Sequence, residues 1–121
     1  SFAIGKQRIH LIRADSHESY TLKRAKNILE GKYIDLLFID GDHSYEGVKK
    51  DFIMYSSLVR KGGIVVFHDL LPLSRNREVN KFWEEIKSRF TYMEIINESP
   101  PKCGIGVLFF DSNEGKEIIQ C

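Results

Sequence analysis

Two short apolar runs mark the middle of the chain. They read Ile-Asp-Leu-Leu-Phe-Ile at residues 34–39 and Ile-Val-Val-Phe at residues 64–67. A near-continuous apolar run of this length is too short for a buried helix and is typical of a parallel strand covered on both faces. Between the runs, apolar residues recur at helical intervals, at Val48, Phe52, Tyr55 and Val59. The pattern predicts a strand, a helix and a strand, which together form a right-handed crossover unit.

The segment before these runs predicts one more strand and one more helix. Residues 8–14 alternate in the manner of a strand, which ends at Asp15-Ser16. Residues 19–30 repeat apolar positions at helical spacing, and Gly31 supplies a stop.

The segment after these runs predicts a helix and two strands. Val79, Phe82, Trp83 and Ile86 share one side of the helix, and Phe82 and Trp83 are predicted to be core residues rather than a binding platform. The strands are expected at residues 92–97 and 105–110. The connection between them is too short for a parallel crossover, so this pair is predicted to be antiparallel.

Length and composition narrow the class of protein. The length of 121 residues predicts one domain. The formal net charge of +1 gives no electrostatic field strong enough to attract nucleic acid or a membrane surface. The partner of the chain is expected to be a small molecule or a protein. Cys103 and Cys121 show no zinc-ligand spacing and are predicted to be free thiols. Without a bilayer-spanning apolar run or a signal-peptide pattern, the chain is predicted to be cytoplasmic.

Polar residues gather where three of the predicted strands end. These ends are Asp15-Ser16, Asp40-Gly41-Asp42-His43 and His68-Asp69. Ligands of open α/β sheets bind outside the carboxyl ends of the strands. Asp and Ser also form turns and cap helices, which is the preferred interpretation of Ser44. The turn at residues 40–43 offers two carboxylates and an imidazole, more than capping requires, and this favours a functional role.

The chemistry of these ends suggests a cation and a base. If the strands that end in Asp40 and Asp69 are neighbours, their carboxylates can converge on one hard cation. His43 would then act as general base, because an imidazole ordinarily titrates near neutral pH. Three alternatives stay open for His68: a structural residue, a third ligand or a proton-transfer group. A loop with Arg75 and Arg77 would close over a substrate or, as the preferred interpretation, is solvated.

The motifs resemble class I S-adenosylmethionine-dependent methyltransferases of the methyltransferase domain family 24 type. They lie in residues 34–45, with the Asp-Gly-Asp-His-Ser-Tyr turn, and in residues 58–69, with Lys-Gly-Gly before a strand. The turn is most similar to that of cephalosporin-hydroxylase-like and macrolide sugar O-methyltransferases. The resemblance covers residues 8–110.

The resemblance implies an α/β fold with a Rossmann-like sheet, mostly parallel, with an antiparallel carboxyl-terminal hairpin. The cofactor would be S-adenosylmethionine, with Asp15 and Ser16 near its adenine and Asp40 near its methionine end. In metal-dependent members, the positions of Asp40, His68 and Asp69 bind Mg²⁺, and His68 stands where the family has an acidic residue. His43 matches a position proposed as the catalytic base.

The chain also departs from the family pattern. No glycine-rich turn and no first two strands of the family precede residue 8, so the sheet would lack its centre. The chain would then be a piece of a larger protein, pair the strands on either side of the gap directly, or complete its sheet through another chain. An exposed strand edge favours association, and a homo-oligomer is one expectation. Two functions follow: O-methyl transfer to a small-molecule hydroxyl, or a catalytically inactive methyltransferase-fold fragment that serves as a binding or assembly module.

Overall fold

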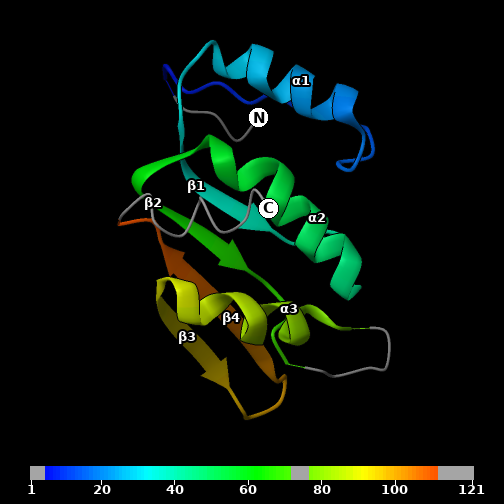
Figure 1. Cartoon of the computed structure of the whole chain (residues 1–121), viewed down its shortest axis with the longest axis vertical. Coiled ribbons are helices and arrows are strands. Elements are labelled where there is room, and N and C mark those ends of the chain that lie inside the picture. Colours follow the sequence, from blue (N-terminus) through cyan, green and yellow to red (C-terminus); the bar gives the residue numbers. More distant parts are fainter. Residues whose placement is uncertain (1–4, 72–76, 112–121) are drawn as a thin grey trace. The chain divides into compact units, whose positions relative to one another are not determined.

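The structure is a computed structural model that describes residues 5–71 and 77–111. The chain divides into two compact units, residues 1–32 and residues 33–121, and each is described by itself (Figure 1). The first unit contains helix α1, and the second contains a four-stranded sheet with two longer helices. The expected single domain stays a prediction.

Helix α1 (Ser19–Leu29) forms where the apolar spacing predicts it. Thr21 is its buried residue, and the Thr21 hydroxyl donates to the backbone carbonyl of Asp15 at 2.6 Å. The helix ends at Glu30, whose φ of 52° is left-handed, and Gly31 follows with a φ of 81°. The predicted stop is therefore confirmed.

The predicted strand at residues 8–14 is wrong: among the described residues this segment has no strand partner. Its apolar positions are open to solvent, with Ile9 50% and Leu11 87% exposed. A strand exists only where a neighbour satisfies its N–H and C=O groups. Alternating side chains alone do not supply that neighbour.

The second unit begins with the predicted crossover. The crossover consists, in chain order, of strand β1 (Ile34–Ile39), helix α2 (Tyr45–Tyr55), a 3₁₀ turn (Ser56–Leu58) and strand β2 (Val59–Phe67). Strands β1 and β2 are parallel. The unit continues with helix α3 (Val79–Ile86), a 3₁₀ turn (Lys87–Arg89) and strands β3 (Thr91–Asn97) and β4 (Cys103–Phe109). The predicted antiparallel hairpin of β3 and β4 is confirmed.

The sheet order is β1-β2-β4-β3, and the sheet is mixed. One ladder is parallel, whereas β2 with β4 and β3 with β4 are antiparallel. The expectation of a mostly parallel sheet is therefore wrong for the described residues, because the segment at residues 8–14 adds no parallel strand.

Helices α2 and α3 cover the same face of the sheet (Figure 1). Their apolar stripes contribute Phe52, Phe82 and Trp83 to a core that includes Phe67 of β2. All four side chains are at most 2% exposed. The predicted core role of Phe82 and Trp83 is confirmed.

The other face of the sheet carries apolar side chains that the described structure leaves exposed. Leu36 is 52% and Phe38 49% exposed on β1, and Met93 is 46% and Ile95 53% exposed on β3. The register pairs these residues with other apolar residues of β2 and β4. The prediction that β1 is covered on both faces therefore holds for one face only.

The Lys-Gly-Gly segment forms a bulge within β2, which runs without a break from Val59 to Phe67. The register passes from Ile34 opposite Val59 to Leu36 opposite Ile64. Gly62 has a φ of 81°, and a Cβ on Gly63 would lie 2.7 Å from a Val59 methyl carbon. Two glycines thus let β2 resume its pairing after the bulge. Helix α2 ends at Tyr55, before this segment.

The Trp83 side chain connects α3 to the hairpin of β3 and β4 by a hydrogen bond. Its indole N–H donates to the Glu94 carboxylate at 2.7 Å, and the Lys87 ammonium lies 3.1 Å from the same oxygen. The Trp83 hydrogen bond and the Lys87 contact lower the pKa of Glu94, and Glu84 and Glu94 together raise the pKa of Lys87. The indole ring lies over Gly106 of β4, where an added Cβ would be 2.8 Å from ring carbons.

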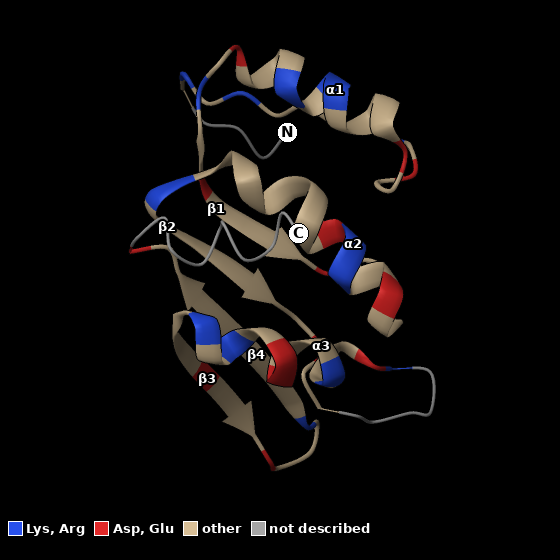
Figure 2. Cartoon of the chain, in the orientation of Figure 1, with Lys and Arg blue, Asp and Glu red and all other residues tan. Residues whose placement is uncertain are grey.

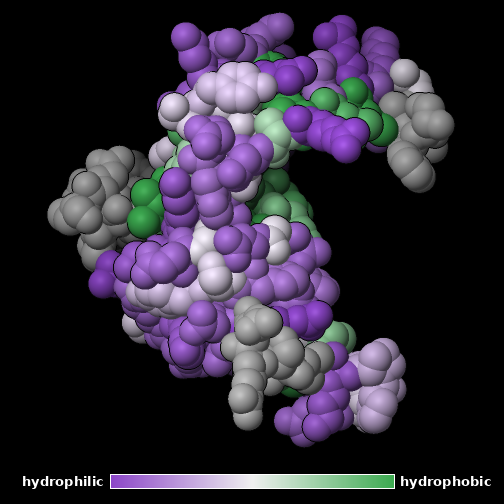
Figure 3. All heavy atoms as spheres, turned by 90° about the vertical axis from the view of Figure 1, so that its right-hand side faces the viewer, coloured by the Kyte–Doolittle hydropathy of each residue, from purple (hydrophilic) through white to green (hydrophobic). Residues whose placement is uncertain are grey.

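The helices differ in their charged residues. Figure 2 shows Lys and Arg beside Asp and Glu on α2 and α3, whereas α1 carries Lys and Arg and no acidic residue. Most of the surface seen in Figure 3 is hydrophilic. Within the described ranges, each helix is too short or too polar to cross a membrane.

We predict that Gly106→Ala destabilises the fold by about 1–3 kcal/mol, because the new methyl group overlaps a Trp83 ring that is fully packed. Urea denaturation monitored by Trp83 fluorescence measures the loss. Cys103→Ala, at an exposed position of the same strand, is the matched control and should change stability little. Equal effects of the two substitutions would contradict the packing account.

Candidate functional site

The parallel pairing of β1 and β2 places their carboxyl ends at one edge of the sheet. Ile39, the last residue of β1, lies opposite Phe67, the last residue of β2. Asp40 follows the first strand directly, and the backbone N–H of His68 still donates to the Ile39 carbonyl at 3.2 Å. The two polar strand ends are therefore adjacent.

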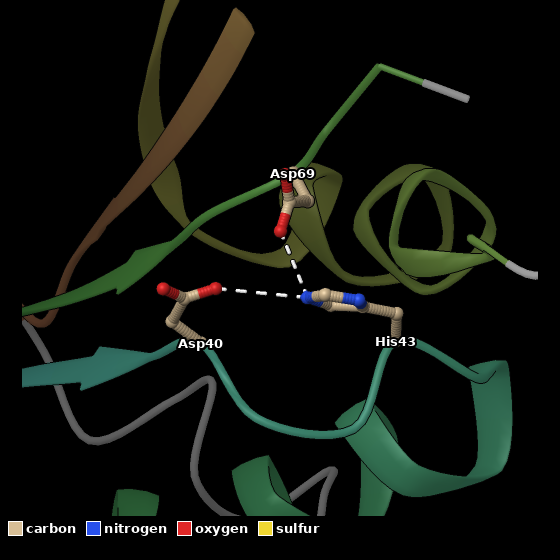
Figure 4. Close-up of side chains that lie close together, drawn as sticks. All are labelled: Asp40, His43 and Asp69. Carbon is tan, nitrogen blue, oxygen red and sulfur yellow. Dashed lines mark ion pairs between the residues drawn. The ribbon is translucent and has the colours of Figure 1, made fainter. Parts of the chain in front are cut away.

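Four side chains from these ends converge. His43 Nε2 lies 2.8 Å from Asp69 Oδ2 and 3.6 Å from Asp40 Oδ1. Figure 4 shows this imidazole nitrogen pointing between the two carboxylates. From the other strand end, His68 Nδ1 lies 3.1 Å from the same Asp69 oxygen and 3.5 Å from the same Asp40 oxygen. The structure thus brings together Asp40, His43, His68 and Asp69.

The four groups differ in exposure. The side chain of Asp69 is 14% exposed and that of Asp40 is 44% exposed, with the two imidazoles between these values. The His43 Nε2 and His68 Nδ1 atoms are buried, and neither has a partner in hydrogen-bond geometry. Their short distances to the carboxylates are thus close approaches rather than aligned hydrogen bonds. One nitrogen or oxygen atom from each of Asp40, His43 and Asp69 lies within 4.8 Å of the other two.

Asp69 has the most buried side chain of the four, and several contacts fix its carboxylate. Burial opposes its ionisation, but the contact with His68 and the charges of Arg77 and His43 outweigh burial and lower its pKa. The Arg77 guanidinium donates to Asp69 Oδ1 at 3.2 Å, which leaves Oδ2 for the imidazoles. Its φ of 61° is left-handed, a conformation that Asp tolerates better than most residues. The sequence did not predict that Arg77 binds this carboxylate. Arg75 lies outside the described residues.

Part of the turn between β1 and α2 holds the shape of the turn and does not face the site. Asp42 Oδ1 accepts from the Ser44 backbone N–H at 2.8 Å, and Ser44 Oγ accepts from the Gly47 N–H at 3.0 Å, so the predicted cap is confirmed. A Cβ on Gly47 would lie 2.2 Å from Asp42 Cγ. The backbone N–H of Glu78 donates to the His43 carbonyl at 2.7 Å. Asp42 therefore shapes the turn, and His43 projects from it into the site.

A cavity of about 460 Å³ opens beside this turn. Ser44, Tyr45, Glu46, Glu78 and Lys81 line it. The Tyr45 hydroxyl donates to Glu85, and Lys49 contacts both groups, so the wall of the cavity is tied to α3. These contacts raise the pKa of Lys49 and lower that of Glu85. The cavity provides space for a small molecule next to the residue that follows His43.

Asp15 and Ser16 belong to the first unit. Asp15 Oδ1 accepts from the His17 N–H at 2.9 Å, and the Asp15 carbonyl accepts from Thr21, so Asp15 forms the turn that precedes α1. Both residues are exposed. Their predicted role in cofactor binding stays a prediction.

Comparison with known families decides the ancestry of this arrangement. Residues 3–70, more than half of the chain and including all four converging residues, match a methyltransferase domain family. The chain belongs to this family. It is also 30% identical over 100 residues to protein y4gI of Sinorhizobium fredii and 58% identical over 36 residues to protein R132 of Acanthamoeba polyphaga mimivirus.

Solved structures show the same fold over part of their length. The O-methyltransferase from Bacillus cereus in complex with SAH has a TM-score of 0.54 at 17% identity, with 74% of this chain and 46% of that chain covered. TomG, the O-methyltransferase from Streptomyces achromogenes involved in tomaymycin synthesis, in complex with SAM, has a TM-score of 0.52 at 18% identity, with 74% and 48% covered. The chain spans about half of these proteins, and 10% and 16% of the two sequence relatives. Its sheet is thus part of a methyltransferase fold.

We predict that Gly47→Ala costs about 1–3 kcal/mol of stability, because the new methyl group overlaps the Asp42 side chain that shapes the turn. Thermal unfolding measures the loss, and the amide signals of Asp42 to Ser44 in an NMR spectrum report the displaced turn. Lys50→Ala, at an exposed position of the same helix, is the control. An unchanged turn in the Gly47 variant would contradict this account.

Proposed function

We propose that this chain takes part in S-adenosylmethionine-dependent O-methyl transfer to a small-molecule hydroxyl. The observation that carries the proposal is the convergence of Asp40, His43, His68 and Asp69 at the carboxyl-end edge of the sheet. The family of the chain and its likeness to O-methyltransferases with SAM or SAH support the reaction class.

The cofactor supplies a methyl group on a positively charged sulfonium centre. Asp40 would attract this positive charge, because it is a carboxylate and has the most exposed of the four side chains. Together with Asp15 and Ser16, which we propose for the adenine end, Asp40 would position the cofactor. Positioning supplies much of the rate of such a transfer.

The acceptor must lose its hydroxyl proton as its oxygen gains the methyl group. We propose His43 Nε2 as the proton acceptor. The imidazolium formed there would lie 2.8 Å from Asp69 Oδ2 and 3.6 Å from Asp40 Oδ1, where the carboxylates stabilise its charge. General base catalysis of this kind contributes about 10²–10⁴-fold. The cavity that begins at Ser44 would hold the acceptor.

Magnesium does not fit this donor set well. Mg²⁺ prefers oxygen ligands in octahedral geometry, whereas two of the four groups here offer imidazole nitrogen. No step of the proposed reaction is therefore assigned to magnesium.

The alternative function, an inactive binding or assembly module, has one observation in its favour. Leu36, Phe38, Met93 and Ile95 expose an apolar sheet face that a partner would cover. The two functions differ in turnover, since a module of this kind would bind without transferring a methyl group.

We expect the chain to bind S-adenosylmethionine and S-adenosylhomocysteine in titration calorimetry and to form S-adenosylhomocysteine with a panel of sugar and phenol acceptors. His43→Gln should lower kcat about 10²–10⁴-fold and leave cofactor affinity unchanged. His10→Gln, outside the four converging residues, is the matched control. Absence of heat with both cofactor forms would overturn the proposal, and binding without turnover on any acceptor would favour the module.

A further inference from the structure

We propose that the cavity beside the turn between β1 and α2 binds a hydroxyl compound that also carries a protonated amine, and that Glu46 sets this preference. The inference rests on the proposed function, since it names the chemical class of the acceptor that His43 would serve. It concerns side chains outside the four converging residues at the strand ends.

The charges that line the cavity do not balance. The lining contains two carboxylates, Glu46 and Glu78, and one ammonium group, Lys81. Lys81 Nζ lies 2.5 Å from a Glu78 carboxylate oxygen, so this pair carries no net charge. Behind the wall, Lys49 Nζ lies 3.2 Å from the Glu85 carboxylate, and this second pair is also neutral. The negative charge of Glu46 is therefore left over.

The two lining carboxylates differ in their contacts. The Lys81 ammonium and the backbone N–H of Tyr45 bind the Glu78 carboxylate and lower its pKa. Glu46 is exposed and has no ion pair or hydrogen bond with another residue of the described ranges. It lies in the first turn of α2, but the Ser44 side chain already caps that helix. The Glu46 carboxylate is thus available to a ligand.

The cavity lies next to the proposed base. The backbone N–H of Glu78 donates to the His43 carbonyl at 2.7 Å, and Ser44 follows His43 directly. A volume of about 460 Å³ suits a small molecule. A carboxylate attracts an ammonium group and repels an anion. A cationic acceptor therefore gains a contact with Glu46 that a neutral acceptor lacks.

The test compares three phenols of similar shape that differ in charge: tyramine is cationic, para-ethylphenol is neutral and para-hydroxyphenylacetate is anionic. Each is titrated into the full chain without cofactor, and the amide signals of Tyr45, Glu46 and Glu78 in an NMR spectrum report binding in the cavity. We expect tyramine to bind about three- to tenfold more tightly than para-ethylphenol, because solvent partly screens a charge contact in an open cavity. The anion should bind most weakly.

Two substitutions change the charge of the lining in opposite directions. Glu46→Gln should reduce the ratio of tyramine to para-ethylphenol affinity to about one. Lys81→Gln releases Glu78 from its ion pair and should raise the same ratio. Glu98→Gln, at an exposed position outside the cavity lining, is the matched control and should leave the ratio unchanged. Circular dichroism checks that each variant is folded.

The outcomes separate this proposal from that of methyl transfer. Unchanged amide signals with all three phenols, equal affinities, a preference for the anion, or a tyramine preference that survives Glu46→Gln would each refute the cationic class. Formation of S-adenosylhomocysteine from neutral acceptors alone would keep methyl transfer and refute this inference. A tyramine preference without S-adenosylhomocysteine from any acceptor would refute methyl transfer and keep the cavity as the site of a cationic ligand.

Discussion

The parallel pairing of β1 with β2 is the constraint on which the candidate site depends. Because the two strands run in the same direction and in register at their ends, the residues that follow them emerge side by side. The crossover helix α2 makes this pairing possible, and its buried stripe joins the strands to α3 and the hairpin. The bulge at residues 60–63 lets β2 resume its pairing with β1, so the end of β2 stays level with Ile39. Packing far from the site therefore fixes its geometry.

The site places two carboxylates beside two imidazoles and an arginine, with Asp69 largely buried and Asp40 exposed. Asp69 stays ionised although it is largely buried, because His68, Arg77 and His43 surround it with positive or polar groups. The two imidazoles approach the carboxylates without aligned hydrogen bonds. The proton transfer proposed for His43 depends on the contacts of its imidazole with the two carboxylates.

The sequence predicted most of the second unit because its signals are local. Short apolar runs predicted β1 and β2, helical spacing predicted α2 and α3, and a short connection predicted the hairpin. The sequence failed at residues 8–14, where a correct alternation has no strand beside it in the described residues, and on the second face of β1. Both failures concern neighbours, which a local pattern does not encode.

The site was predicted in part for the same reason. Asp40, His43, His68 and Asp69 follow predicted strands, so their convergence needed only the assumption that the strands are adjacent. Arg77 reaches Asp69 from a different loop, and Gly47 makes room for Asp42 across a helical turn. Such contacts depend on side-chain positions in three dimensions and have no signature in spacing.

The convergence of two imidazoles on Asp69 is the central claim, and NMR of the histidine side chains tests it most directly. The account predicts that Asp69→Asn shifts the imidazole nitrogen resonances of both His43 and His68, while those of His10 and His17 stay in place. A spectrum in which His43 and His68 respond no more than His10 and His17 would contradict the account, because the two strand ends would then not meet at one carboxylate.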